Sequence, residues 1–302
     1  MKMDRRQFLA SAVAGASAAL LGCGGAGARQ AAAAPVNPYG LVPLGKTGIK
    51  VSRIGFGTGM RGGGRESNQT RLGREPFEGL LKEAYARGIR LFDMADMYGT
   101  HEYVARALKG LPRDQFVLVT KMWVHRGGIP EAERPDANIL VDRFRKELQT
   151  DYIDLVLLHC MMSPKWPEDQ KRQMDILEDL KAKKVIRAHG ISCHSFGTLE
   201  AAVATPWVDS VHVRINAYGE KMDGPCEKVA PVVAQLHKAG KGVIGMKLIG
   251  EGAFRASDEK RNVSVRYVLG LGTVDAMVVG FEKIAEVDDF AARVTSAMQA
   301  KA

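Results

Sequence analysis

One regular pattern constrains the fold of this chain more than any other feature: from Val51 onward, short apolar segments alternate with longer amphipathic ones. The apolar segments are rich in β-branched residues and the amphipathic ones are about 10 to 16 residues long, which indicates repeated strand–helix units and a parallel sheet. The expected strands are residues 54–58, 91–95, 116–121, 153–159, 188–193, 210–215, 243–247 and 276–280. The expected helices include residues 77–87, 101–108, 137–148, 170–183, 199–204, 228–238 and 263–269.

Eight such units in about 250 residues predict an α/β fold of the (β/α)8 TIM barrel type. A doubly wound open sheet is the alternative for the same alternation. The 302 residues would also allow two domains, but the unit count favours one barrel domain over residues 35–302. Residues 44–51 place glycine turns between apolar positions, which predicts a β-hairpin that closes the bottom of the barrel. The polar, glycine-rich segment 61–74 is expected to be a mobile loop on the opposite face.

The first 34 residues have the features of an export leader. Arg5 and Arg6 precede an uncharged apolar stretch from Phe8 to Leu21, which is a twin-arginine signature read by the Tat export machinery. As a helix this stretch would be about 21 Å long, too short for the roughly 30 Å hydrocarbon core of a bilayer. We therefore expect a periplasmic or exported protein. Processing is open between a lipobox that ends at Cys23, giving a membrane-anchored lipoprotein, and cleavage in the alanine run that ends at Ala34.

The net charge of +9 would fit a nucleic-acid partner, but the leader inflates it. The leader holds four basic residues and one acid, which leaves 39 basic and 33 acidic residues, or +6, for the remainder. These charges are interspersed. We therefore expect no nucleic-acid partner, and membrane contact only through the leader or a lipidated Cys23.

Ionisable side chains stand at the C-terminal ends of three expected strands: Asp93, with Tyr98 just beyond it, then Lys121 and His159. In a barrel these ends meet at one mouth. A buried lysine beside a tyrosine favours the phenolate, so we expect Lys121 to lower the pKa of Tyr98 and Asp93 to hold Lys121 charged. His159 would position a carbonyl oxygen. The set predicts a proton donor for the reduction of a small-molecule carbonyl substrate, provided that a hydride source lies alongside.

Several segments between about residues 41 and 290 resemble the aldo-keto reductase family. Residues 91–99 resemble its F-D-T-A-x-x-Y-G segment, residues 120–123 its T-K-x-W segment, residues 154–159 its D-L-x-L-x-H strand, and residues 190–192 its G-[IV]-S-N segment. The resemblance implies reduction of an aldehyde or ketone by NADPH or NADH, with NADPH the family habit. It implies a catalytic tetrad of Asp93, Tyr98, Lys121 and His159, with Tyr98 as the general acid.

The resemblance also implies cofactor contacts, several of which depart from the family pattern. Ser192 matches the serine that contacts the nicotinamide carboxamide, whereas Cys193 replaces the expected asparagine. His212 stands where many members carry a carboxamide-binding glutamine, and Met246 where many carry a tyrosine stacked on the nicotinamide. The expected set is completed by Lys247, Gly280, Lys283 and Glu286. Glu286 falls near the position of an arginine that binds the 2′-phosphate of NADPH, where an acid would repel phosphate unless Lys283 substitutes.

Two tryptophans, Trp123 and Trp166, are expected either to line a substrate pocket or to pack within loops. Substrate choice would depend on loops 61–74, 125–136 and 161–167, and a chain that stops soon after its last helix would leave an open mouth.

Three alternatives stay open at this stage. Cys160 and Cys193 end neighbouring strands and could form a disulfide. Together with His159 and His194 they could instead form a Cys2His2 metal set, although consecutive strand residues point to opposite faces and no metal is expected. The barrel could also bind a nucleotide as a non-catalytic subunit.

Overall fold

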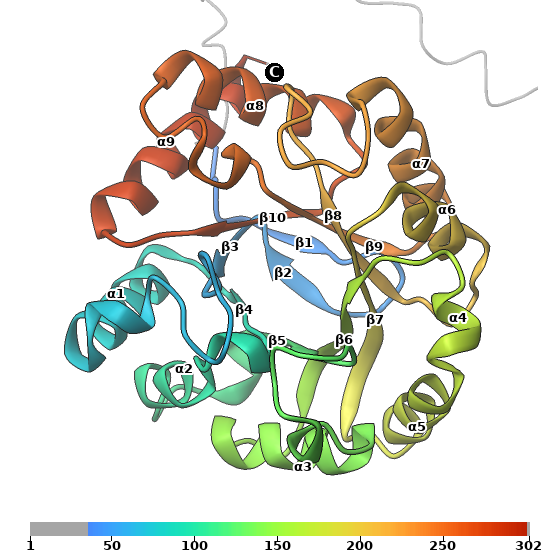
Figure 1. Cartoon of the computed structure of the whole chain (residues 1–302). Coiled ribbons are helices and arrows are strands. Elements are labelled where there is room, and N and C mark those ends of the chain that lie inside the picture. The colour runs from blue at the N-terminus through green and yellow to red at the C-terminus, as the bar shows by residue number, and fades with distance from the viewer. Residues whose placement is uncertain (1–35, 301–302) are drawn as a thin grey trace, which may run out of the picture. The chain divides into compact units, whose positions relative to one another are not determined.

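Eight parallel strands close into a ring in the computed structural model, which describes residues 36–300. The strands are β3 (Ile54–Gly57), β4 (Leu91–Asp93), β5 (Val117–Met122), β6 (Ile153–Met161), β7 (Ile186–Cys193), β8 (Ser210–Arg214), β9 (Gly242–Met246) and β10 (Ala276–Gly280). They pair in chain order, and β10 returns to pair with β3 (Figure 1). This closure confirms the expected (β/α)8 barrel and excludes the open sheet.

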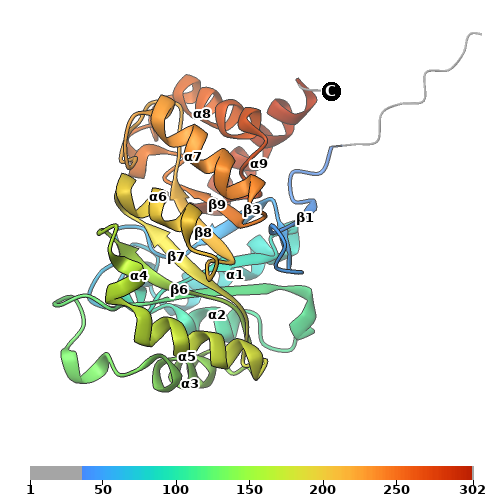
Figure 2. The same cartoon turned by 90° about the vertical axis from the view of Figure 1, so that its right-hand side faces the viewer.

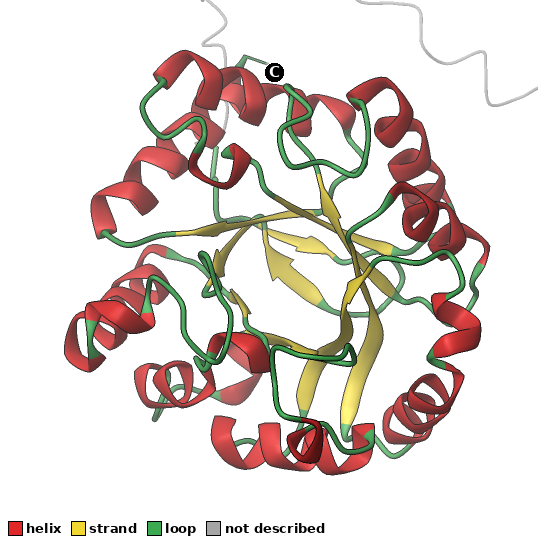
Figure 3. Cartoon of the chain, in the orientation of Figure 1, coloured by secondary structure: helices red, strands yellow, loops and turns green. Residues whose placement is uncertain are grey.

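Helices follow the strands and form an outer layer around them (Figure 3). They are α1 (Arg74–Arg87), α2 (His101–Ala107), α3 (Ala137–Leu148), α4 (Trp166–Asp169), α5 (Lys171–Ala182), α6 (Phe196–Ala204), α7 (Cys226–Lys238), α8 (Asp258–Leu271) and α9 (Ile284–Gln299). Short 3-10 helices are η1 (Thr70–Leu72), η2 (Asp96–Tyr98), η3 (Arg113–Gln115), η4 (Glu131–Glu133) and η5 (Gly250–Gly252). Between residues 36 and 300, no helix is both long enough and apolar enough to cross a bilayer.

Strand periodicity divides the core into two layers, because successive side chains point to opposite faces. The outward residues pack against the helices in a large apolar cluster, for example Phe56 of β3 and Val211 of β8. The inward residues form a second cluster inside the ring, for example Leu91 of β4, Val119 of β5 and Leu157 of β6. Continuing the inward positions toward the C-terminal ends of the strands leads to polar side chains.

A β-hairpin closes the other end of the ring. Its strands, β1 (Leu41–Pro43) and β2 (Lys50–Ser52), pair antiparallel. Leu44 and Ile49 in the turn join the inward apolar cluster. An added Cβ at Gly45 would lie 2.4 Å from the backbone nitrogen of Gly242, so the turn packs directly against the start of β9. Figure 2 shows β1 at one end of the barrel. The expected hairpin is therefore present, although residues 44–49 form its turn rather than its strands.

Residues 57–62 have the spacing G-x-G-x-x-G, which begins at the last residue of the first barrel strand. In a dinucleotide-binding sheet this spacing opens a helix whose N-terminus faces the pyrophosphate. Here the next α-helix, α1, begins only at Arg74. The spacing therefore belongs to a loop at the barrel mouth and not to a dinucleotide fingerprint.

Candidate active site

A buried ion pair lies at the mouth of the barrel, between Asp93 at the end of β4 and Lys121 near the end of β5. Lys121 Nζ lies 2.6 and 2.7 Å from the two carboxylate oxygens of Asp93, and 2.9 Å from the carbonyl oxygen of Met94. These contacts commit all three N–H donors of the ammonium group. Burial favours the neutral form of Asp93, but Lys121 and His212 outweigh it and hold the pKa of Asp93 at about 2.

Tyr98, in η2, meets His159 above this pair. The Tyr98 hydroxyl lies 3.3 Å from His159 Nε2, and the two rings are nearly perpendicular with centroids 5.5 Å apart. Lys121 Nζ lies 5.3 Å from the centre of the Tyr98 ring. Because its donors are committed, Lys121 faces the Tyr98 ring without a hydrogen bond to the hydroxyl.

The electrostatics of Tyr98 differ from the expectation that Lys121 lowers its pKa. Burial and the charge of Asp93 together raise the pKa of Tyr98. Burial, assisted by the charge of Lys121, lowers the pKa of His159 well below its usual value. At neutral pH the site therefore holds a protonated phenol beside a neutral imidazole.

The loop after β3 packs directly on Tyr98, a contact that no motif in the sequence predicts. An added Cβ would lie 2.3 Å from the Tyr98 ring at Gly59 and 2.5 Å from it at Gly62, so a side chain at either position would displace the ring or the loop. Arg65 fixes the same loop through ion pairs to Asp96, at 3.2 Å, and to Glu133. The segment expected to be a mobile loop thus has definite partners around the proton donor.

Two inward residues beside this cluster suit an amide group. Ser192 of β7 and His212 of β8 are register partners on neighbouring strands. The Ser192 hydroxyl oxygen accepts a hydrogen bond from the backbone N–H of Cys160 at 2.7 Å, which leaves its proton available as a donor. His212 Nε2 lies 2.9 Å from Asp93 Oδ1, while His212 Nδ1 is buried without a partner among the described residues. A donor and an acceptor side by side fit the carboxamide of a nicotinamide.

The remaining expected cofactor residues surround the mouth on β9, β10 and α9. Met246 ends β9, and Lys247 follows it with a positive φ of 62° and an ion pair to Glu251 at 2.7 Å. Gly280 ends β10, where an added Cβ would lie 2.2 Å from the side chain of Met60.

At the start of α9, Lys283 is exposed at the N-cap. Glu286 accepts a hydrogen bond from the backbone N–H of Glu282 at 2.8 Å and pairs with Arg255 at 2.6 Å. Arg255 also pairs with Glu282 at 2.9 Å. Two carboxylates therefore stand at the position where the resemblance implies a phosphate-binding arginine.

Two expected site residues face away from the mouth. Cys193 is fully buried in the apolar layer between strands and helices, because it follows the inward-facing Ser192 by one residue. Trp166 is 1% exposed in the same layer, and its ring centre lies 6.2 Å from that of Trp207. Trp166 of α4 therefore packs in the layer between strands and helices rather than at the mouth. Trp123 does lie at the mouth, with its ring centre 5.4 Å from that of His159.

The cysteine alternatives find no support in the structure. Cys160, Cys193 and Cys226 are free thiols. Within residues 36–300 no three His, Cys, Asp or Glu side chains gather in a way that could hold a metal ion, so His159, Cys160, Cys193 and His194 do not form a Cys2His2 set.

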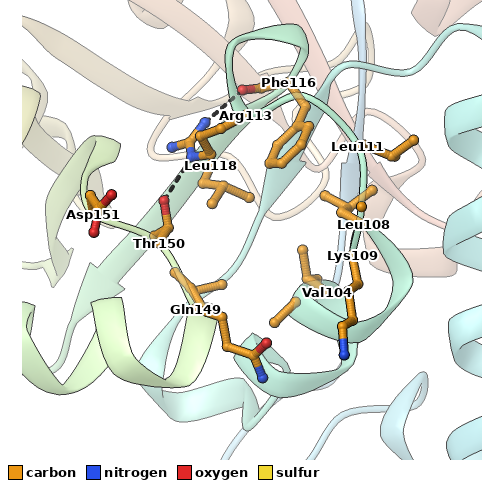
Figure 4. A pocket seen from close by; sticks show the side chains of 13 residues that line it. Val104, Leu108, Lys109, Leu111, Arg113, Phe116, Leu118, Gln149, Thr150 and Asp151 are labelled. Carbon is orange, nitrogen blue, oxygen red and sulfur yellow. Dashed lines mark hydrogen bonds between the residues drawn. The ribbon is translucent and has the colours of Figure 1, made fainter.

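A separate cleft of about 320 Å³ lies on the flank of the barrel, between the C-terminal ends of α2 and α3 (Figure 4). Val104, Leu108 and Leu118 are among its apolar walls. Arg113 crosses its edge and donates to Thr150 Oγ1 at 2.9 Å and to the carbonyl oxygen of Phe116 at 2.9 Å. The start of β5 borders this cleft, so it lies toward the closed end of the barrel. None of the four ionisable residues at the mouth lines it.

Comparison with known proteins gives a consistent family match. The model of the Aldo/keto reductase family matches residues 53–264. Over 169 residues the chain is 34% identical to an NADH-specific methylglyoxal reductase of Escherichia coli, which covers 49% of this chain and 50% of that protein. The aligned parts cover 50 to 63% of the first curated relatives, so the chain spans about half to two thirds of their length.

Solved structures share the fold. A putative aldo-keto reductase from Pseudomonas aeruginosa superposes with a TM-score of 0.71 at 24% identity, covering 87% of this chain and 97% of that one. An aldo-keto reductase from Klebsiella pneumoniae in complex with NADPH superposes with a TM-score of 0.61 at 22% identity, covering 86% and 90% of the two chains.

Proposed function

Because the chain belongs to the aldo-keto reductase family, we propose that it is an NAD(P)H-dependent oxidoreductase that reduces the carbonyl group of an aldehyde or ketone to an alcohol. The observation that carries this proposal is the contact between the Tyr98 hydroxyl and His159 above the buried Asp93–Lys121 pair. The order of these four residues along the chain supports it further.

The residues divide the chemistry as follows. Tyr98 donates its proton to the carbonyl oxygen, and its raised pKa keeps it protonated until that oxygen becomes basic. The positive charge of Lys121 then stabilises the phenolate that remains, and Asp93 keeps Lys121 charged and in place. His159, as a neutral imidazole, orients the carbonyl oxygen toward the phenol.

A nicotinamide nucleotide, when bound, supplies the hydride. Ser192 and His212 would hold its carboxamide through the free hydroxyl proton and the unpartnered Nδ1. The Klebsiella relative in complex with NADPH and the NADH-specific Escherichia coli relative support this cofactor class. Lys283 and Glu286 would lie toward the adenosine end.

The proposal is tested by following NADPH and NADH oxidation with a panel of aldehydes and ketones. Tyr98→Phe removes the donated proton and should lower kcat by about 10² to 10⁴-fold while nucleotide binding persists. Tyr85→Phe is the matched control, because Tyr85 is on α1 and its hydroxyl donates a hydrogen bond to Gln115 Oε1 outside the site. Full activity of Tyr98→Phe would refute the mechanism. Nucleotide binding without turnover on any carbonyl would favour the non-catalytic alternative.

We further propose that residues 1–34 direct Tat-dependent export and that residues 35–302 form the enzyme domain of a periplasmic or exported protein, which is either released by cleavage near Ala34 or anchored through a lipidated Cys23 that precedes the domain. This leader lies outside the described residues, and Arg5, Arg6 and the apolar stretch from Phe8 to Leu21 support the proposal. Replacing both arginines by lysine should retain the protein in the cytoplasm, as measured by cell fractionation. The mass of the mature N-terminus distinguishes cleavage near Ala34 from lipidation at Cys23.

A further inference from the structure

The hydrogen bond between His212 and Asp93 joins an expected cofactor-binding residue to an expected catalytic residue. His212 is fully buried, and its Nε2 lies 2.9 Å from Asp93 Oδ1, the same oxygen that Lys121 approaches at 2.6 Å. The two residues are 119 positions apart in the chain. Asp93 therefore receives two donors on one oxygen, from β5 on one side and from β8 on the other.

This contact fixes the state of the imidazole. An aspartate that already pairs with Lys121 is a carboxylate, which only accepts hydrogen bonds, so His212 Nε2 must carry the proton. Nδ1 is then the lone-pair nitrogen, and it is the atom that is buried without a partner. Burial lowers the pKa of His212, against the opposing effect of Asp93, so the ring is neutral at neutral pH.

We propose that His212 is a positioning residue for carbonyl reduction: its Nε2–H holds the Asp93 carboxylate in the orientation that binds Lys121. The inference rests on the proposed function of the same site. Without this donor the carboxylate can rotate, and Lys121 loses the fixed position from which its charge acts on Tyr98.

The contact also predicts a pH effect. The ionisable groups that face Asp93 are Lys121 of β5, His212 of β8, Tyr98 of η2 and His159 of β6. Of these, Lys121 and His212 favour the carboxylate. Loss of the His212 donor therefore raises the pKa of Asp93, and the acid limb of the kcat profile should move to higher pH.

The experiment compares His212→Leu with His212→Gln. Leucine removes the donor, and kcat should fall about ten- to a hundredfold, with the acid limb displaced upward and the KM for the carbonyl nearly unchanged. A glutamine amide N–H reaches about as far from the backbone as imidazole Nε2, so His212→Gln should return the acid limb of the kcat profile to its wild-type position, a readout that carboxamide binding alone would not move. His189→Gln is the control, because His189 is equally buried but packs on Trp207 outside the mouth.

A second measurement does not depend on turnover. In nitrogen NMR of the histidine-labelled full chain, the ring signal that is present in the wild type and missing in His212→Gln is assigned to His212. This ring should have Nε2 protonated and Nδ1 unprotonated, and it should not titrate between about pH 5 and 8. Three results would each overturn the proposal: a wild-type kcat in folded His212→Leu, an equal displacement of the acid limb in both variants, or an Nδ1–H tautomer of His212. Absence of NAD(P)H-linked turnover in the wild type, with the expected tautomer present, would instead overturn the proposed function.

Discussion

Gly62 should be essential for the rate of the reaction although it carries no side chain. An added Cβ at this position would lie 2.5 Å from Tyr98 Cδ1, whereas two carbon atoms in contact prefer about 3.5 to 4.0 Å. Gly62→Ala therefore requires a displacement of about 1 Å or more. The ring of Tyr98 is the partner that moves, because the loop is fixed in two ways. The backbone N–H of Gly62 donates a hydrogen bond of 3.1 Å to the carbonyl oxygen of Gly59, and Arg65 forms ion pairs.

Misplacing a reacting group by about 1 Å can cost about 10²-fold in rate, and overpacking costs ~1–3 kcal/mol in stability. We expect Gly62→Ala to lower kcat by about that factor, with a modest fall in Tm. The assay is steady-state NAD(P)H oxidation with a saturating carbonyl substrate, together with thermal unfolding of the same preparations.

Gly63→Ala is the matched control in the same loop. Gly63 is exposed, has an ordinary φ, and an added Cβ there has open space around it. It should leave both kcat and Tm unchanged. If Gly62→Ala lowered Tm but kept the kcat of Gly63→Ala, the loop and not Tyr98 would have moved, and the reasoning would be refuted.

Three further predictions follow from charge and burial. Asp93→Asn leaves Lys121 buried without its counter-charge and should destabilise the fold by ~3–5 kcal/mol in thermal or urea unfolding at neutral pH. The pKa of Asp93 is held at about 2, below its unfolded value of about 3.9, so the stability that the pair provides is present above about pH 4 and is lost as the pH falls toward 2. The difference in unfolding free energy between wild type and Asp93→Asn should therefore shrink between about pH 4 and 2. Trp123→Ala should raise the KM for the carbonyl with little change in Tm, whereas Trp166→Ala should lower stability by ~3–5 kcal/mol with KM unchanged; the reverse pattern would contradict the placement of both rings. Glu286→Arg should raise the affinity for NADPH relative to NADH by about tenfold or more, as measured by fluorescence titration. The reason is that the substitution replaces repulsion of the 2′-phosphate with a charge-assisted hydrogen bond. An unchanged ratio of the two dissociation constants would place the phosphate elsewhere.

Local periodicity was enough to predict the barrel. Every expected strand overlaps an observed one, and the helix expected over 137–148 coincides with α3. The same alternation explains why Asp93, Lys121 and His159 meet: each continues an inward-facing series of apolar residues at the end of its strand. A strand-end residue out of that phase, such as Cys193, points into the helix layer however well it matches a motif.

Contacts that depend on how strands are staggered around the ring could not be predicted from the sequence. The bond from His212 to Asp93 and the packing of Gly62 on Tyr98 both join residues distant in the chain. Burial of Trp166 depends on the short helix α4, which has too few residues to show a period. The strand β6 continues past the expected end to Met161 because of a register shift at which Cys160 adopts a φ of 65°. A regular alternation carries no sign of such a bulge.

The hairpin that closes one end of the ring also determines from which end reactants enter and leave. Within residues 36–300, Leu44 and Ile49 fill that end of the ring, so reactants would reach Asp93, Lys121 and His159 from the opposite end. A molecule bound deep in the ring could then leave only after a molecule bound nearer the open end had left.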